Sequence, residues 1–423
     1  MPTDDIREMG SAPPGPRPLR ARARAFLLAP PVYLGFLCLL AVAAAVHMVL
    51  LGPARALSHP PFGPYTHFNN YVIFKQSFAH LVAGQDLYAL FPAEHFDYYK
   101  YSPTFAALMA PFSLLPTTLG LVLFNLLNAA VLAAAIARLP VLDARAKGLF
   151  VWYIAPEALG AAQGTQTNLL VLGLLVLAFA FCEERRPLAA SLLVVLSFYV
   201  KLFGLVAGLL FLLYPQRKRL VLATGAWVLA LGLLPLLFVS PAQLAFLYRS
   251  WLGLLRADGL ASVGSPASFS VMGWMHAWLG LVPNPLAVVG AGLALLLLPL
   301  LNVRAYPDFH FRLTFLAAVL IWVVIFNHKA ESPTFVIAAG GVALWYFSRP
   351  PRPLRRLLAW GSFALTSIAY SDLTPGPVKA RFVFPLVLKV IGPTLVWLAI
   401  VREECRFPPA APDPGAGEAT AAP

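Results

Sequence analysis

Apolar runs recur along almost the whole chain, from Phe26 to Val401. A helix needs about 20 mostly apolar residues to cross the roughly 30 Å hydrocarbon core of a bilayer. Of the 423 residues, 60% are apolar and 12% are charged, a balance that is outside the range of soluble globular domains. The pattern predicts an all-α, polytopic bundle of transmembrane helices.

The apolar runs place about twelve spans. They cover residues 26–51, 117–138, 148–162, 168–182, 187–200, 202–214, 220–239, 284–303, 313–327, 334–347, 357–371 and 383–401. The first run is longer than the apolar part of a cleaved signal peptide, which has about 7–15 residues. We therefore expect it to remain in the protein as the first span.

Basic residues give the expected orientation. Most of them fall in short segments on one side of this layout, such as EERR at 183–186 and PQRKR at 215–219. The positive-inside rule makes that side cytoplasmic, and it also holds both termini. This placement accounts for the net charge of +13 without a nucleic-acid partner. We expect a multi-pass protein of a bacterial inner membrane, with the loops 52–116 and 240–283 on the external, periplasmic face.

The termini differ in composition from the membrane domain at 26–401. Residues 1–25 and 402–423 are rich in Pro, Ala and Gly, which predicts disordered cytoplasmic segments. The three cysteines, Cys38, Cys182 and Cys405, are scattered along the chain. They support neither a disulfide framework nor a metal site, and no cofactor is expected.

The first external loop is expected to contain an amphipathic helix at 70–83, lying on the membrane surface and closed by Gly84. Its apolar stripe consists of Tyr71, Phe74, Phe78, Leu81 and Val82. A lid that only packs against the bundle is the alternative.

An acidic and aromatic group follows this helix. If residues 94–101 are helical, Glu94, Asp97 and Tyr101 share a face, and Lys100 lies three residues from Asp97. A carboxylate there would suit a general base that takes a proton from a hydroxyl. The alternative is a local ion pair between Asp97 and Lys100. Asp86, two residues after a glycine, has the pattern of a turn or cap residue.

Two further polar sites lie at the outer ends of later spans. In QGTQTN, Gln166 and Asn168 suit either sugar hydroxyls or an unsatisfied helix end. Lys201 interrupts the apolar run YVKLFGL. It is expected either to hold a phosphate or to extend its charge to the membrane surface.

A third polar site is NHKAESPTF at 327–335, which carries His328, Lys329 and Glu331 between two apolar runs. Ionisable groups at a membrane boundary are costly and indicate function, although Lys329 and Glu331 are also placed to neutralise one another. Carboxylates and cations on one face fit glycosyl transfer from a lipid-phosphate sugar. That reaction needs a base for the acceptor and charge stabilisation for the leaving phosphate.

These motifs, in this order, resemble glycosyltransferase family 87, the integral-membrane hexosyltransferases. The resemblance rests on YVIFKQSFAHLVAGQDLY, YKYSPTFAALMAPFSLLP, QGTQTNLLVLGLL, YVKLFGL and NHKAESPTF. It implies a GT-C fold, an external first loop with the catalytic acid, and no metal. It also implies a polyprenyl-phosphate hexose donor, such as the mannose carrier, a glycan or glycolipid acceptor, and inversion at the anomeric carbon.

One departure from the family affects the expected base. Members carry a catalytic Asp in a pattern like Asp-Phe-x-x-Tyr at the start of the loop helix, and this chain has Asn69 and Asn70 in that region. An amide is not a base, so if the family's mechanism holds, a carboxylate elsewhere in this chain must take the role. The candidates are Asp86, Glu94, Asp97 and Glu331, of which Asp97 is favoured. The expected substrate contacts are Lys201, Lys329 and His328 for the phosphate, Gln166 and Asn168 for the sugar, and Asn70, Lys100 and Tyr101.

Two other functions remain open from the sequence. A transporter or flippase of an amphiphilic or anionic solute would line a pathway with the same charges, but would show paired broken spans. A non-catalytic relative would bind the lipid-linked sugar without turnover.

Overall fold

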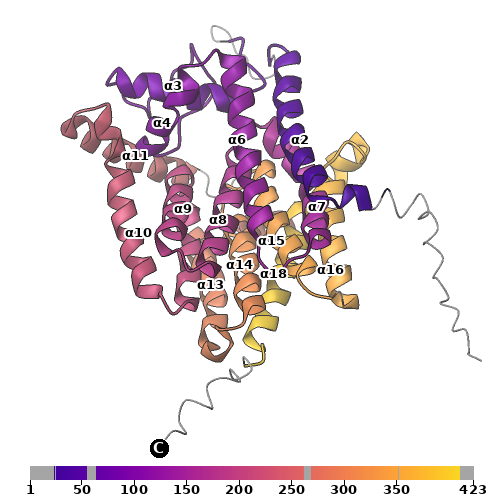
Figure 1. Cartoon of the computed structure of the whole chain (residues 1–423). Helices are drawn as coiled ribbons and strands as arrows, with labels where there is room; N and C mark the ends of the chain where they lie inside the picture. The colour runs from indigo at the N-terminus through magenta and orange to yellow at the C-terminus, as the bar shows by residue number, and fades with distance from the viewer. Residues whose placement is uncertain (1–22, 24, 55–62, 262–267, 351, 410–423) are drawn as a thin grey trace, which may run out of the picture.

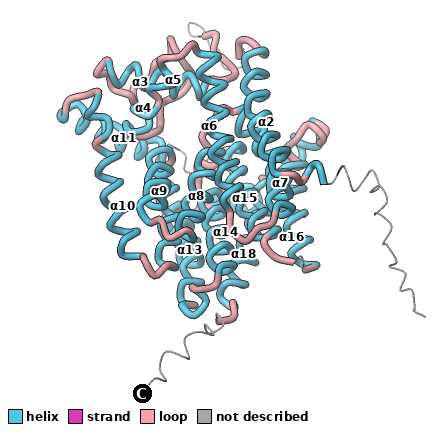
Figure 2. The backbone as a smooth tube through the Cα atoms, in the orientation of Figure 1, coloured by secondary structure: helices cyan, strands magenta, loops and turns pink. Residues whose placement is uncertain are grey.

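The structure is a computed structural model that describes residues 23, 25–54, 63–261, 268–350 and 352–409. In these residues the chain forms helices joined by loops, and the only extended pairing is an isolated bridge between Pro53 and Thr66 (Figure 2). The predicted all-α fold is confirmed. Most of the two terminal segments that we expect to be disordered, residues 1–22 and 410–423, lies outside the described residues.

Each predicted span falls on a helical segment of the structure. These are α2 (Pro30–Leu50), α6 (Thr117–Arg138), α7 (Ala144–Gln163), α8 (Asn168–Glu183), α9 (Pro187–Val200), η2 (Leu202–Leu213), α10 (Arg217–Gly232), α13 (Pro285–Leu297), α14 (Phe309–Ile325), α15 (Phe335–Phe347), α16 (Pro353–Phe363) and α18 (Leu388–Cys405). Helix α18 continues to Cys405, beyond residue 402, where the tail was expected to begin.

Among the residues that the structure describes, length and composition suit a membrane crossing in three helical segments, Pro30–Leu50, Thr117–Arg138 and Arg217–Leu237. A fourth candidate is the bent pair Gly376–Val383 and Leu388–Cys405, whose two parts meet at 57°. Six shorter apolar helices accompany them. These apolar helices indicate a membrane protein. The expected number of twelve crossings remains a prediction.

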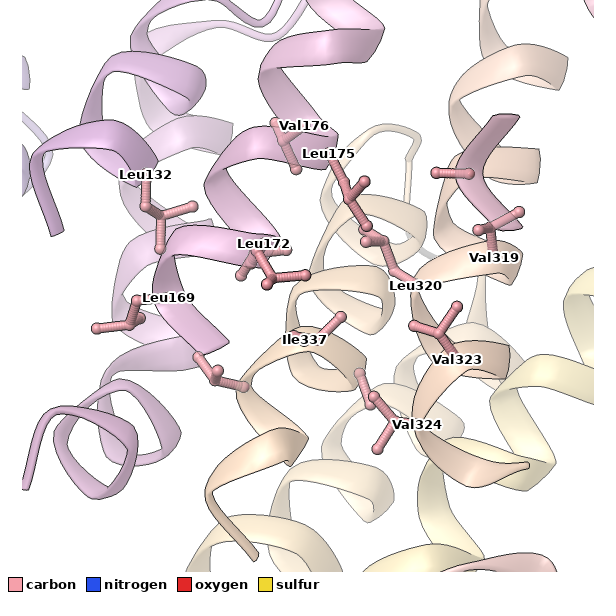
Figure 3. Packing of buried hydrophobic residues seen from close by; sticks show 14 of the residues in the cluster. Leu132, Leu169, Leu172, Leu175, Val176, Val319, Leu320, Val323, Val324 and Ile337 are labelled. Atoms are coloured by element: carbon pink, nitrogen blue, oxygen red, sulfur yellow. The ribbon is translucent and has the colours of Figure 1, made fainter. Parts of the chain in front are cut away.

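Helices α8, α14 and α15 form the centre of the bundle. Every side chain of α15 from Phe335 to Tyr346 is buried, because α7, α8 and α14 pack around it. A helix that is apolar on all sides suits either a buried core or a membrane span, and α15 has the central position. Figure 3 shows the contact region, where Leu172 and Leu175 of α8 lie near Leu320 of α14 and Ile337 of α15.

Two adjacent glycines let the central helices approach closely. A Cβ on Gly341 would lie 2.7 Å from the carbonyl oxygen of Ala317 in α14, and one on Gly340 would lie 2.7 Å from the side chain of Leu172. Small residues at helix crossings allow this packing in membrane bundles. The close approach fixes α15 and therefore the start of that helix, where the NHKAESPTF segment ends.

A layer of short helices covers one end of the bundle. It contains α3 (Asn69–Val82), α4 (Pro103–Leu108) and α5 (Ala110–Ser113), with α11 (Pro241–Ala261) beside α4 (Figure 1). Helix α3 matches the helix predicted at 70–83, and Gly84 follows it with a left-handed φ of 68°.

The helix considered for residues 94–101 is absent. These residues form turns and bends, and Asp97 has a φ of 79°, a left-handed value that a right-handed helix does not contain. Glu94, Asp97 and Tyr101 therefore do not share a helical face, and that prediction is wrong.

Candidate functional site

Lys201 lies at a break between two helices. Helix α9 ends at Val200, and Lys201 has an extended backbone with a φ of −145° before η2 begins. Its ammonium group donates to Oδ1 of Asn168 at 2.7 Å and to Oε1 of Gln166 at 3.3 Å. The break turns the lysine towards the start of α8, where both amides lie.

Glu331 joins the same network from the other side. Nε2 of Gln166 donates to Oε2 of Glu331 at 2.5 Å, and Nδ2 of Asn168 donates to Oε1 of Gln166 at 3.3 Å. The Gln166 oxygen thus accepts two hydrogen bonds while its nitrogen serves the carboxylate, which fixes the orientation of the amide. We call Lys201, Gln166, Asn168 and Glu331 the amide-bridged cluster.

The two charged groups of this cluster contact neutral partners. Among the described residues, neither Lys201 nor Glu331 forms an ion pair within 4.0 Å. Amide oxygens compensate an ammonium charge less completely than a carboxylate does, and a charge-assisted hydrogen bond to an anion is stronger. Lys201 therefore keeps the capacity to bind an anion.

Tyr101 lies beside the cluster. Its ring packs against Phe74 at 4.7 Å and Phe105 at 4.9 Å between centroids. Burial raises the pKa of the Tyr101 phenol, and the charge of nearby Glu331 adds to the shift. The phenol is therefore protonated at neutral pH and available as a hydrogen-bond donor.

A second group of charges lies near the cluster and alternates in sign. Lys100 Nζ lies 3.0 Å from Asp97 Oδ2 and 3.9 Å from Asp258 Oδ1 of α11, and Lys329 forms an ion pair with Asp258. Burial alone would lower the pKa of Lys100, but Asp97, Asp258 and Glu331 outweigh it and raise that pKa. The predicted local Asp97–Lys100 pair is confirmed. The predicted neutralisation of Lys329 by Glu331 is wrong, because Lys329 pairs with Asp258.

The other two candidate carboxylates are engaged elsewhere. Asp86 accepts from the backbone nitrogen of Tyr88 at 3.1 Å and from the hydroxyl of Ser250 at 2.9 Å, as its turn pattern predicts. Glu94 lies 3.0 Å from Nε2 of His80 at the far end of α3. Both carboxylates therefore hold the outer layer together.

The two asparagines at the start of α3 use their side chains as donors. Asn69 donates to the carbonyl of Phe96 at 2.7 Å and accepts from the Phe96 nitrogen at 2.9 Å. Asn70 donates to the carbonyl of Gly164 at 2.8 Å. An ionised carboxylate has no proton to donate, so both positions need the amide for these contacts.

His328 lies between Asn327 and Lys329, and its backbone carbonyl accepts from the hydroxyl of Ser268 at 2.6 Å. Burial lowers the pKa of its imidazole, and the charge of Lys329 lowers it further. The ring is therefore neutral at pH 7 and has one N–H to offer a ligand.

Sequence reasoning missed a buried ion pair next to the cluster. Lys389 of α18 lies 3.0 Å from Glu157 of α7, and the two residues are only 3% and 6% exposed. It also missed Asp258 in the external loop. The sequence did contain a signal for the buried ion pair. An acidic residue interrupts one apolar run and a basic residue interrupts another, and this pattern favours pairing of the two inside a membrane bundle.

A comparison with protein families identifies the family to which the chain belongs. The model of glycosyltransferase family 87 matches residues 99–326, which is more than half of the chain. The match contains Lys100, Tyr101, Gln166, Asn168 and Lys201. The chain matches no curated protein. On the strength of the family match, the chain belongs to glycosyltransferase family 87 and is a membrane-embedded glycosyltransferase that acts on a sugar donor and an acceptor.

Proposed function

We propose that the protein transfers a hexose, with mannose as the first candidate, from a polyprenyl-phosphate carrier to a glycan or glycolipid on the external face of a bacterial inner membrane. The transfer inverts the anomeric carbon. Family membership supports the transferase class. The observation that carries the choice of donor is Lys201, whose ammonium group is held by two neutral amide oxygens.

The surroundings of Lys201 suit a single phosphate attached to a lipid. A phosphate oxygen replaces an amide oxygen on the ammonium and gains a charge-assisted hydrogen bond. Lys201 interrupts an apolar run, so an anion bound there lies next to apolar helix surface that accommodates a lipid chain. The neutral ring of His328 offers one N–H donor, and Lys329, although it pairs with Asp258, adds a second cation. Gln166 and Asn168 then have hydrogen-bonding groups free for sugar hydroxyls.

Glu331 is proposed as the general base. Asp97, favoured from the sequence, is ion-paired with Lys100, whereas the hydrogen bond to Glu331 comes from the neutral amide of Gln166. Through this amide, Glu331 is one side chain away from Lys201. A sugar whose phosphate rests on Lys201 would therefore present its anomeric carbon near this carboxylate.

The proposed step balances without a further reagent. The acceptor hydroxyl oxygen forms a bond to the anomeric carbon while the bond from that carbon to the phosphate oxygen breaks. The phosphate leaves with the bonding electron pair and is stabilised by Lys201. The hydroxyl proton passes to Glu331.

The test is sugar transfer by the purified protein in lipid vesicles, with radiolabelled polyprenyl-phosphate-mannose as donor and a mixed membrane glycolipid fraction as acceptor. The control donor is the same sugar attached to a nucleotide. We expect labelled product with the lipid donor alone. Product from the nucleotide donor would contradict the donor class. Lipid-donor binding without transfer or hydrolysis would identify a non-catalytic relative, and movement of intact donor across the bilayer would identify a flippase.

A further inference from the structure

Glu331 and Ser332 connect two polar groups in different parts of the bundle. Glu331 has an extended backbone, with a φ of −98° and a ψ of 162°, and Ser332 begins a short 3-10 helix directly after it. The side chains of these two neighbours reach different groups. Glu331 accordingly contacts Gln166, while the hydroxyl of Ser332 accepts from Lys389 at 2.8 Å. A movement of Ser332 therefore turns Glu331 as well.

Lys389 is fully engaged at its buried position. Its Nζ lies 3.1 Å from Oε1 and 3.0 Å from Oε2 of Glu157, and Ser332 takes the third direction. The rings of Phe335 and Tyr370 lie 5.5 Å and 5.0 Å from the ammonium. An ammonium has three donors, so this lysine, in contrast to Lys201, has none left for a ligand. Its contacts point to a structural effect on the residues around it.

Burying the Lys389–Glu157 ion pair has a desolvation cost, and apolar residues could fill the same space without it. Replacing a buried pair by apolar residues of similar volume is often neutral or stabilising, whereas removing one partner is strongly destabilising. Glu157 and Lys389 come from α7 and α18, and Ser332 is the point at which their pair contacts the segment that carries Glu331.

We propose that Lys389 and Glu157 are positioning residues that hold Ser332 and thereby set the direction of the Glu331 carboxylate. This inference rests on the proposed function of Glu331 as the base. The pair acts through the backbone of residues 331 and 332 and does not touch the substrate. Its effect is therefore on the rate of the chemical step and not on donor affinity.

The test uses the full chain in lipid vesicles and compares Ser332→Ala, Ser332→Thr and Thr394→Ala. Ser332→Ala removes the contact with Lys389 and leaves the ion pair in place. Thr394→Ala removes a hydroxyl from the helix that carries Lys389, α18. Within the described part of the chain, this hydroxyl donates to the carbonyl of Val390 in its own helix and has no other bond. We expect Ser332→Ala to lower kcat about threefold to tenfold, the effect of one hydrogen bond, with donor KM unchanged. Ser332→Thr restores kcat, and Thr394→Ala keeps it.

Equal kcat for Ser332→Ala and the wild type would overturn the inference, as would a loss confined to KM.

The double variant Lys389→Met/Glu157→Met removes both charges together. We expect it to fold and to show the same loss of kcat as Ser332→Ala. Hydrogen exchange of the backbone amides of residues 331, 332, 334 and 335 gives a readout that needs no turnover. We expect faster exchange there in Ser332→Ala than in Thr394→Ala, and equal exchange would overturn the inference. A wild type without turnover would contradict the proposed function, and hydrogen exchange alone would then decide on the role of Lys389.

Discussion

The side-chain amide of Gln166 donates to the carboxylate of Glu331 over 2.5 Å, although the two residues are 165 positions apart in the chain. The other end of the same amide accepts from Lys201 at 3.3 Å. Gln166 thus keeps an acid and a cation close to each other without a direct ion pair. Such an arrangement leaves both charges available, one for a proton and one for an anion.

Lys201→Met is expected to weaken donor binding. The variant loses a charge-assisted contact to the proposed phosphate, which is worth about 1.5–3 kcal/mol, or an increase in donor KM of roughly 10- to 150-fold. Lys218→Met, at an exposed position in the first turn of α10, is the matched control and should leave KM unchanged. A donor KM equal to wild type in Lys201→Met would remove the phosphate role.

Asn70→Asp is expected to destabilise the outer layer. In the wild type the carbonyl of Gly164 accepts a hydrogen bond from Asn70. The variant loses this bond and places a carboxylate against the carbonyl, which costs about 1–3 kcal/mol of folding free energy. The measurement is the apparent melting temperature in detergent. Gln76→Glu is the control, since it makes the same chemical change in α3 at a side chain without a hydrogen bond among the described residues. Equal melting temperatures for the two variants would contradict the role of the amide.

His95 is expected to make stability depend on pH. Its side chain is 3% exposed, its ring contacts the carbonyl of Asp97 through Nδ1 at 3.1 Å, and burial lowers its pKa. Below the unfolded pKa of about 6.5 the unfolded chain binds this proton more readily, so the unfolding free energy falls with falling pH by at most about 1.4 kcal/mol per unit.

The corresponding experiment compares wild type and His95→Asn between pH 7.5 and 5.5. The decrease in apparent melting temperature towards pH 5.5 should be smaller in the variant, because asparagine keeps a donor but does not titrate. Parallel decreases in the two proteins would show that His95 does not contribute.

Gly341→Ala is expected to push α14 and α15 apart. The added methyl would meet the carbonyl of Ala317 at 2.7 Å, and overpacking of this kind costs about 1–3 kcal/mol. Gly361→Ala is the control, because apart from the adjacent backbone of its own helix no atom of the described residues lies within 4 Å of its Cβ position, and alanine favours a helix by up to about 1 kcal/mol. The melting temperature should fall in the first variant and not in the second.

The sequence predicted the helices well for a simple reason. Residues 117–138 and 187–200 are mostly apolar and are bounded by Pro or charged residues, so composition alone locates their ends, and the structure has the same bounds. The loop at 94–101 was not predictable in this way. Its shape depends on Asn69, 27 positions before Phe96, and on the left-handed backbone of Asp97.

The members of the site were predictable, but their pairing was not. Lys201, Gln166 and Glu331 stand out as polar residues at the ends of apolar runs. Which of them meet depends on how α7, α8, α9 and α15 pack together. The contact of Lys329 with Asp258 instead of Glu331 illustrates this, since Asp258 comes from a helix 71 residues earlier.

The most direct test of the central claim compares turnover and donor binding in Glu331→Gln and Asp97→Asn, with polyprenyl-phosphate-mannose in lipid vesicles. Loss of a general base costs about 10²–10⁴-fold in rate. We predict a loss of that size in Glu331→Gln with donor binding retained, and a much smaller loss in Asp97→Asn. Full turnover in Glu331→Gln, together with a large loss in Asp97→Asn, would contradict the account and assign the base to Asp97.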